Sequence, residues 1–450
     1  MASTYLSKTL STPTNNKIWT YSAWLKLASA GSATESPVSS GTDANNRGIV
    51  YFNGGNNEIQ YYEATSGTTS IHLTTNRLFR DISAWYHIVL SVDTTQATDS
   101  DRVKIYVNGV QETSLATATY PTLDYNTKIN SAVNMSIGSA NSYGGALHFS
   151  GSMAHVNFID GTAYDASTFG ETNAASGIWT PLASPSVTYG TNGFFLKFAS
   201  SGALGTDSSG EGNTFTVNGP GTQTQDAPSN VFTTLNPLNV PTSNKPTFAN
   251  GNTTSTTPGS SGRFGGTSTL GMSKAKYYWE AKFVISALSR GEFGITYDPG
   301  EQARNNATAS NYADAWCYQS EAGYIRNNNS ILDTEATYTN GDIVMCALDL
   351  DNNYVYFGKN GTWVNSGDPT SGSSGTGGYA ITSGETYFTI TSDNTSGSDQ
   401  QTYQFNFGNG YFGTTAVASG NADGAGYGIF EYAPPTGYYS LCTKNINTYG

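Results

Sequence analysis

Apolar and polar residues alternate along much of the first 180 residues. In residues 19–27, Trp19, Tyr21 and the three aliphatic positions that follow at every second residue share one face, and mostly polar residues take the other. This period of two predicts half-buried β-strands. Residues 85–92 form a more apolar run, and residues 102–107 alternate up to Asn108-Gly109, a strong hairpin signal. No segment in this part predicts a long helix.

The texture changes between residues 184 and 266. Prolines recur from Pro220 to Pro258 between loops that are rich in Gly, Ser and Asn, and residues 250–266 are nearly all Gly, Asn, Ser and Thr. Proline fixes φ and removes a backbone donor, so this stretch is predicted to run extended as an ordered connector. Residues 250–266 are the part of it that we expect to be flexible.

A second strand-rich region follows. Residues 277–285 alternate, and residues 342–350 lead through Asp351-Asn-Asn into residues 354–357, closed by Asn360-Gly361. The sequence therefore predicts an all-β fold class: two antiparallel β-sandwich domains of the jelly-roll type, joined by an extended Pro/Gly-rich connector. The predicted boundaries are 1–183 for the first domain, 184–266 for the connector, and 267–450 for the second domain with its C-terminal tail.

Composition excludes several classes of protein. Charged residues are 12% of the chain, against about 25% in ordinary domains, and aromatic residues are 13%. A disordered chain has the opposite balance. The net charge of −13 with dispersed Lys and Arg argues against nucleic acid as a partner. No apolar run is long enough for membrane insertion, and the N-terminus lacks the apolar core of a signal peptide. Cys317, Cys346 and Cys442 lack metal-ligand spacing and are expected to be buried, reduced thiols.

Two blocks of the sequence resemble known domain families. Residues 85–96 and 102–109 resemble a laminin-G-like domain of the concanavalin A-like superfamily, and residues 151–161 fit its closing strand. In the second region, Lys276-Tyr-Tyr-Trp-Glu280 and Asn353-Tyr-Val-Tyr-Phe-Gly-Lys-Asn-Gly361 resemble a SPRY domain, together with Gly294-Ile-Thr and Gly341-Asp-Ile-Val.

The order of the two domains and the motifs between them extend the resemblance over nearly the whole chain. Those motifs include Gly193-Phe-Phe-Leu-Lys-Phe, Asp226-Ala-Pro-Ser-Asn230 and the ending Tyr432-Ala-Pro-Pro. Taken together, the chain resembles structural proteins of marine tailed phages, of the tail-fibre or capsid-fibre type. The composition suits an extracellular adhesive surface, although the chain has no signal peptide and no disulfide framework. A phage structural protein accounts for both observations, because it is made in the cytoplasm and reaches the outside when the cell lyses.

This resemblance implies a non-enzymatic appendage on the virion surface, a fibre, knob or decoration, made in the host cytoplasm. Its partners would be other virion proteins, two further copies of itself in a homotrimer, and a host surface glycan or protein. One alternative is a purely structural capsid decoration, cement or fibre-assembly protein without a host ligand. A remote alternative is a glycan hydrolase.

The hydrolase alternative needs two carboxylates about 5–9.5 Å apart. The nearest candidates are Glu58 and Glu63, and alternation places them on opposite faces of one strand. The four histidines (His72, His87, His148 and His155) are dispersed, and no Gly-x-Ser-x-Gly elbow is present. The sequence therefore predicts that the protein is not an enzyme.

Aromatic side chains are the predicted recognition elements, because sugar rings stack on Tyr and Trp, although core packing is the alternative at each position. The candidates are Trp24, Tyr61, Tyr62, Tyr143, Tyr312, Trp316 and Tyr318. Calcium is a weaker possibility: Asp207, Ser209, Glu211 and Asn213 place oxygen-bearing side chains at alternate positions with Gly in two gaps. A solvated turn is the alternative there, and Asn218 stands where an acid would strengthen the case. No other cofactor is expected.

Overall fold

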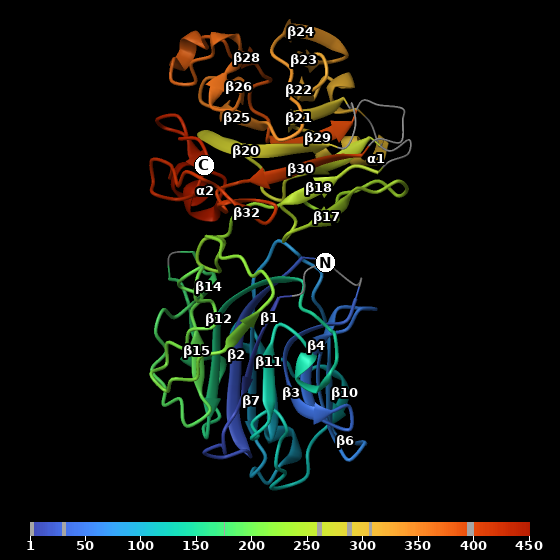
Figure 1. Cartoon of the computed structure of the whole chain (residues 1–450), viewed down its shortest axis with the longest axis vertical. Coiled ribbons are helices and arrows are strands. Elements are labelled where there is room, and N and C mark those ends of the chain that lie inside the picture. The colour runs from blue at the N-terminus through green and yellow to red at the C-terminus, as the bar shows by residue number, and fades with distance from the viewer. Residues whose placement is uncertain are drawn as a thin grey trace. The chain divides into compact units, whose positions relative to one another are not determined.

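The computed structural model describes residues 4–28, 33–174, 176–258, 263–285, 290–305, 308–393 and 400–450. The chain forms two compact units, Met1–Gln223 and Thr224–Gly450, here called the first and second unit. Both are built almost entirely of antiparallel strands (Figure 1), which confirms the predicted all-β class. The α-helices among the described residues are α1 (Pro299–Asn305) and α2 (Thr443–Tyr449). In this part of the chain no helix has the length and apolar character to cross a membrane.

The first unit is a sandwich of two sheets. In spatial order, the eight-stranded sheet contains β10 (Leu115–Thr119), β6 (Thr68–Leu78), β5 (Glu58–Thr65), β4 (Asn46–Phe52), β3 (Glu35–Asp43), β11 (Asn134–Ile137), β1 (Tyr5–Thr9) and β16 (Thr216–Asn218). The six-stranded sheet contains β15 (Phe194–Leu196), β12 (Gly151–Asp160), β2 (Ile18–Leu27), β7 (Tyr86–Asp93), β8 (Val103–Val107) and β9 (Val110–Gln111). A separate hairpin pairs β13 (Gly170–Thr172) with β14 (Trp179–Pro181).

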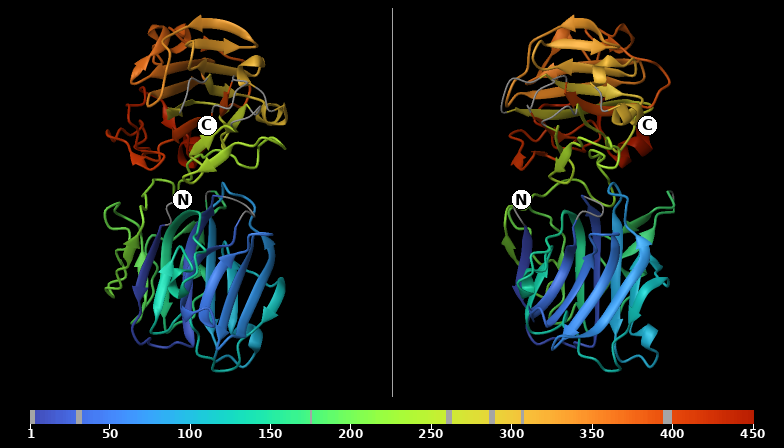
Figure 2. Two further views of the ribbon diagram at one scale, coloured as in Figure 1. Left: turned by 45° about the vertical axis from the view of Figure 1, so that its right-hand side comes forward. Right: turned by 90° about the vertical axis from the view of Figure 1, so that its right-hand side faces the viewer.

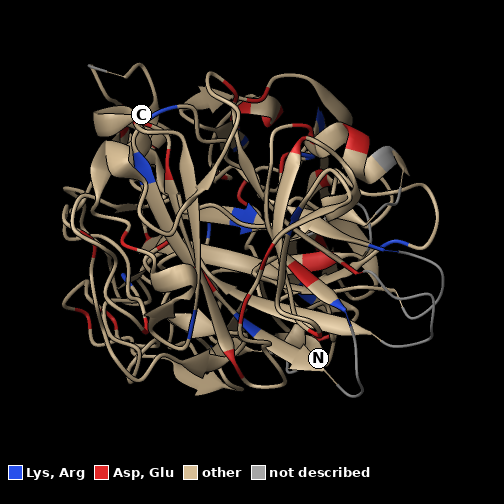
Figure 3. Ribbon diagram, turned by 90° about the horizontal axis from the view of Figure 1, so that it is seen from above, with Lys and Arg blue, Asp and Glu red and all other residues tan. Residues whose placement is uncertain are grey.

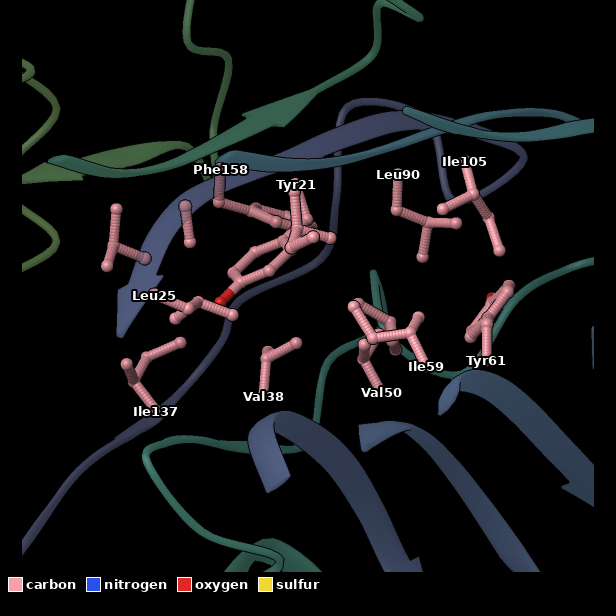
Figure 4. Close-up of a cluster of buried hydrophobic side chains, with 14 of the residues drawn as sticks. Tyr21, Leu25, Val38, Val50, Ile59, Tyr61, Leu90, Ile105, Ile137 and Phe158 are labelled. Atoms are coloured by element: carbon pink, nitrogen blue, oxygen red, sulfur yellow. The ribbon is translucent and has the colours of Figure 1, made fainter. Parts of the chain in front are cut away.

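The core of the first unit lies between its two sheets. Figure 4 shows side chains of the six-stranded sheet (Tyr21, Leu25, Leu90, Ile105 and Phe158) facing those of the eight-stranded sheet (Val38, Val50, Ile59, Tyr61 and Ile137). The alternation of residues 19–27 is confirmed, because its apolar series belongs to this core, but the strand is buried on both faces and not half-buried as predicted. The hairpin is confirmed as well: Asn108 and Gly109 have φ of 48° and 85°, and they join β8 to β9.

The second unit is also a two-sheet sandwich. Its larger sheet contains β17 (Thr247–Ala249), β18 (Thr254–Thr256), β30 (Gln401–Asn406), β20 (Lys276–Ile285), β25 (Ile343–Asp349), β26 (Tyr354–Lys359), β27 (Thr362–Trp363), β28 (Tyr379–Ala380) and β33 (Tyr439–Ser440). Its smaller sheet contains β19 (Phe264–Thr267), β29 (Phe388–Asp393), β21 (Gly291–Thr296), β22 (Ala315–Gln319), β23 (Tyr324–Asn327) and β24 (Ser330–Thr334). β31 (Tyr411–Phe412) and β32 (Thr415–Ala416) pair separately. Figure 2 gives side views in which the strands of each unit stack in layers.

The residues of the predicted connector pack into both units. β15 and β16 add to the sheets of the first unit, whereas β17, β18 and β19 belong to the second, and the division between units falls after Gln223. The predicted flexible stretch 250–266 contains β18 and the start of β19, while its residues 259–262 lie outside the described part. The structure differs from the prediction because three-residue strands between turns can add to sheet edges without a long alternating pattern.

Candidate functional site

A hollow of about 470 Å³ lies on the outward face of the eight-stranded sheet. It is called the β4–β5 groove, after the strands that supply most of its lining. Its lining residues are Thr34, Arg47, Ile49, Tyr51, Asn53, Gln60, Tyr62, Tyr143 and Leu147. Strand alternation creates this face, because Val50, Ile59 and Tyr61 of the same two strands point into the core. Tyr143 and Leu147 come from the segment between β11 and β12, which reaches the same face.

Hydrogen-bonding side chains form a connected series along the groove. The Tyr51 hydroxyl donates to Gln60 Oε1 at 2.5 Å, and His72 Nε2 lies 3.1 Å from the same oxygen. Gln60 Nε2 and Asn53 Nδ2 both donate to Glu58 Oε1, at 3.3 and 2.8 Å. The second carboxylate oxygen of Glu58 is buried without a hydrogen-bond partner. The series thus ends at Glu58, which is buried and is not part of the groove lining.

Arg47 lies at another part of the groove, between two tyrosine rings. Its guanidinium carbon is 5.4 Å from the ring centre of Tyr62 and 4.9 Å from that of Tyr143. The face of an aromatic ring attracts a cation such as this guanidinium. The Arg47 charge lowers the pKa of the Tyr143 hydroxyl, but burial has the larger effect and the pKa is raised overall. The tyrosine ring faces that Arg47 covers are therefore not available to stack on a sugar.

The groove contains two of the seven aromatic candidates, Tyr62 and Tyr143. Tyr312 is half-buried in the second unit, outside the groove. The remaining candidates are Trp24, Tyr61, Trp316 and Tyr318, all of them inside the protein. They cannot stack on a ligand there, which corrects the sequence-based hypothesis for these four positions.

Trp24 is buried because a second layer covers the outer face of the six-stranded sheet. Phe169 and Tyr189, from the segment after β12, pack on Val89, Ile159 and Phe195 of that face. Beside them the Trp24 ring stacks on His87 with ring centres 4.8 Å apart. Alternation predicts that Trp24 faces away from the main core, but it does not predict the layer that covers it.

His87 and Ser22 form a buried pair that resembles a nucleophile and its base only in composition. Trp179 Nε1 donates to His87 Nδ1 at 3.0 Å, so the ring proton is on Nε2, which lies 2.9 Å from Ser22 Oγ. Burial lowers the pKa of His87 to about 3. Nε2 therefore donates to the serine and cannot take its proton, as a general base must.

Glu58 and Glu63 lie on opposite sides of β5, as alternation predicts. Glu63 points inward, where it accepts hydrogen bonds from the Tyr61 hydroxyl at 2.7 Å and from the backbone N–H groups of Lys128 and Ile129 at 2.9 and 3.1 Å. Burial raises the pKa of Glu63 to about 7. Because the sheet separates the two carboxyl groups, they cannot act on one glycosidic bond.

The possible calcium loop is held together by its own hydrogen bonds. Asp207 accepts from the backbone N–H groups of Phe195, Ser209 and Asn213 and from the Ser209 hydroxyl. The Asn213 amide donates to the carbonyls of Thr191 and Gly193, and Glu211 is exposed. These contacts give the loop a structural role. Over the described ranges, no cluster of three or more His, Cys, Asp or Glu is placed to hold a metal ion.

Two family models match the chain. Residues 2–166 match the concanavalin A-like lectin/glucanases superfamily, and residues 276–409 match the SPRY domain. The chain carries a concanavalin A-like domain followed by a SPRY domain. The β4–β5 groove lies in the concanavalin A-like domain. The predicted buried state of the cysteines is also confirmed, since Cys317, Cys346 and Cys442 are buried and free.

Three solved structures are similar to parts of the chain. The SPRY domain of human HERC1 is 17% identical, with a TM-score of 0.27, over 34% of this chain and 86% of that one. The PSpry domain of TRIM65 is 11% identical, with a TM-score of 0.30, over 39% of this chain and 91% of that one. A putative carbohydrate binding protein from Bacteroides ovatus is 17% identical, with a TM-score of 0.35, over 50% of this chain; the chain spans 60% of its length.

Sequence reasoning missed Arg47, Tyr51, Asn53 and Gln60 in the concanavalin A-like domain. The available signal was alternation: in residues 46–52, Arg47, Ile49 and Tyr51 recur at every second position. Residues 58–65 then place Gln60 and Tyr62 on the same face. Recognising both strands and pairing them would have brought these side chains together.

Proposed function

We propose that the chain is a non-enzymatic binding protein whose concanavalin A-like domain binds a saccharide in the β4–β5 groove. The observation that carries this proposal is the groove itself, an open hollow on the outward face of a sheet, lined by amide, hydroxyl and tyrosine side chains. Its volume falls within the about 300–1,000 Å³ that is usual for small-molecule sites.

The chemistry of the lining fits sugar hydroxyls. Gln60 and Asn53 carry amide groups and Tyr51 carries a hydroxyl, and Glu58 behind them accepts hydrogen bonds from both amides. These groups are already joined by hydrogen bonds, so they are fixed in place before a ligand arrives, which lowers the entropy lost on binding. Tyrosine edges and Ile49 supply the apolar surface that the ring carbons of a sugar require.

The arrangement of carboxylates supports binding rather than hydrolysis. Glu58 contacts the lining through Asn53 and Gln60, whereas Glu63 is on the other side of the sheet. Within the described residues, no Asp or Glu belongs to the lining of the groove. A glycosidase needs a pair of carboxyl groups across its substrate.

Removing the Tyr51 hydroxyl or the Gln60 amide is expected to weaken saccharide binding at least tenfold. Tyr51→Phe deletes the group that donates to Gln60, and Gln60→Ala deletes the centre of the series of hydrogen bonds. Ligands are found on a glycan array with the full chain, and their affinities are measured by titration calorimetry. Gln111→Ala, at an exposed position of β9 outside the groove, is the matched control. Unchanged affinity in both groove variants would contradict the proposal.

We further propose that the protein is an appendage on the surface of a phage virion, in which it assembles with other virion proteins as a homotrimer and contacts a host glycan. The support is the resemblance in domain order and connecting motifs, together with a Ser-, Thr-, Asn- and Gly-rich composition that is poor in charge. Nucleic acid and membrane insertion are not part of this proposal.

Immunogold electron microscopy of intact particles, with antibody against residues 267–450, tests the virion proposal. Label at the tail is the result expected of a host-attachment protein. Label spread over the head would favour the alternative, a capsid decoration without a host ligand. Particles that carry no label would refute the virion proposal and leave saccharide binding to be judged by the groove variants.

A further inference from the structure

Arg47 is a basic side chain whose N–H donors have no hydrogen-bond partner in the described part of the chain. It donates no hydrogen bond and forms no ion pair within the described part of the chain, and its Nε atom is buried. A guanidinium carries five N–H donors, and a buried donor without a partner loses its hydration without compensation. Such a group in a native structure calls for an explanation.

The other three arginines of the first unit either have hydrogen-bond partners or are exposed to water. Arg77 Nε pairs with Glu112 at 2.7 Å, and Arg102 donates to the backbone carbonyls of Gln96, Ala97 and Pro121. Arg80 is exposed, so water satisfies its donors. Arg47 alone among these four lines the groove, and Lys and Arg elsewhere in the described chain are few and dispersed (Figure 3).

The structure also holds the guanidinium in position. Tyr62 and Tyr143 flank it, and Tyr62 is itself fixed by an edge contact with His72, with ring centres 5.6 Å apart. A cation held between aromatic rings keeps its planar donor fork free at the edge. That fork fits the two oxygens of a carboxylate or sulfate with two parallel hydrogen bonds.

Glu58, the acid that the groove's amides contact, lies far from Arg47. Arg47 stands near the start of β4, and Asn53, which binds Glu58, comes six residues later, about 20 Å along an extended strand. Glu58 is therefore too far away to neutralise Arg47. The groove has a basic end at Arg47 and a neutral amide end at Asn53 and Gln60.

We propose that the ligand of the β4–β5 groove is an anionic glycan whose acidic group, a carboxylate or a sulfate, binds Arg47. This inference rests on the proposed saccharide-binding function and adds the ligand class. The acidic group occupies the Arg47 end, and neutral hydroxyls of the same glycan contact Gln60 and Asn53.

Titration calorimetry of the full chain tests the inference with three probes: trigalacturonate, the same trisaccharide with its carboxyl groups reduced to alcohols, and a sulfated galactan oligosaccharide. We expect at least one anionic probe to bind tenfold or more tightly than the reduced trisaccharide, and added salt to weaken only the anionic binding. Tighter binding of trigalacturonate or of the sulfated probe identifies which acidic group Arg47 takes.

Variants assign the effect to Arg47. Arg47→Gln is expected to lower anionic affinity to that of the reduced trisaccharide, Arg47→Lys to retain part of it, and Arg80→Gln, which changes net charge equally, to change nothing. If the reduced probe binds as well as both anionic ones, or if Arg47→Gln leaves anionic binding intact, the inference is overturned while the proposed function stands. If no glycan, neutral or anionic, binds the full chain, the proposed function itself fails.

Discussion

Acidification from about pH 7.5 to about pH 4.5 is expected to stabilise the second unit by about 3 kcal/mol and to give the first unit no such gain. The cause is one buried glutamic acid in each unit and, in the first, two histidines whose pKa is lowered by burial. In both units a carboxyl group inside the protein favours the protonated form, so the folded state takes up a proton more readily than the unfolded chain.

Glu280, on β20 of the second unit, is the group that sets the slope there. Its carboxylate accepts from the Tyr278 hydroxyl at 2.8 Å and from the backbone N–H groups of Glu431 and Tyr432, yet burial outweighs these bonds and raises its pKa from 4.5 to about 7. Because the folded pKa is the higher one, the stability that this group contributes is fully present below pH 4.5 and is lost as the pH rises through about 7.

The first unit contains groups whose effects have opposite sign. Glu63 behaves as Glu280 does, because burial raises its pKa from 4.5 to about 7. His87 has a folded pKa of about 3 against 6.5, so its contribution is present above pH 6.5 and is lost as the pH falls toward 3. The effects of Glu63 and His87 are each about 3 kcal/mol between about pH 7.5 and 4.5, at about 1.4 kcal/mol for each pKa unit. Burial lowers the pKa of His155 as well, so the two histidines together offset the gain from Glu63.

Native-state hydrogen exchange in urea, resolved by peptide, measures both units in one molecule. We expect the free energy of opening of β20 peptides to rise on acidification and that of β7 peptides not to rise. Glu280→Gln should remove the gain, while Glu385→Gln, at an exposed position of the same unit, should keep it. His87→Gln should remove the opposing effect of His87, so that the stabilisation from Glu63 on acidification appears in the first unit. Equal slopes in the two units of the unaltered protein would contradict the assignment of these groups.

Asp423→Asn is expected to destabilise the second unit by about 3 kcal/mol, because hydrogen bonds to a charged group contribute about 1.5–3 kcal/mol and a buried donor left without a partner costs about 1–3 kcal/mol. Asp423 is buried, and five donors point at its two oxygens: the backbone N–H groups of Ala425, Tyr427 and Ser440, the Ser440 hydroxyl, and the Asn445 amide. Asparagine keeps the shape but presents an NH₂ group where one oxygen accepted, so donors face a donor.

Urea unfolding of the variant and of the unaltered chain measures this cost. Glu385→Gln again serves as the control, because it removes one negative charge from an exposed position of the same unit. A midpoint shift in Asp423→Asn no larger than in Glu385→Gln would contradict the role assigned to Asp423. In the unaltered protein, we expect the backbone amides from Asp423 to Asn445 to be protected from hydrogen exchange as one cooperative unit.

The sequence was informative about strands and hairpins, and less so about what lies next to them. Period-two alternation in residues 19–27 and the Asn-Gly pairs are local signals, because side-chain direction and positive φ are decided by neighbours in the chain. The division of residues 184–266 between the two units depends on which sheet edges are open, and that depends on distant strands.

The residues of the candidate site could likewise be predicted only where local signals decide their position. Tyr62 and Tyr143 were candidates as aromatic residues and do line the groove, but Trp24 and Trp316 have the same chemistry and are inside the protein. Burial of Trp24 follows from the layer over the six-stranded sheet, which alternation within β2 cannot reveal. Alternation could have placed Arg47 on the outward face, but its lack of a hydrogen-bond partner could not be recognised from sequence, because that is a property of the folded chain.

A crystal structure of the full chain with the glycan that binds it most tightly tests the central claim most directly. The account predicts sugar density in the β4–β5 groove, with hydroxyls within hydrogen-bond distance of Gln60 and an acidic group on Arg47. A sugar bound at any other surface of the chain, with the groove holding only water, would contradict it.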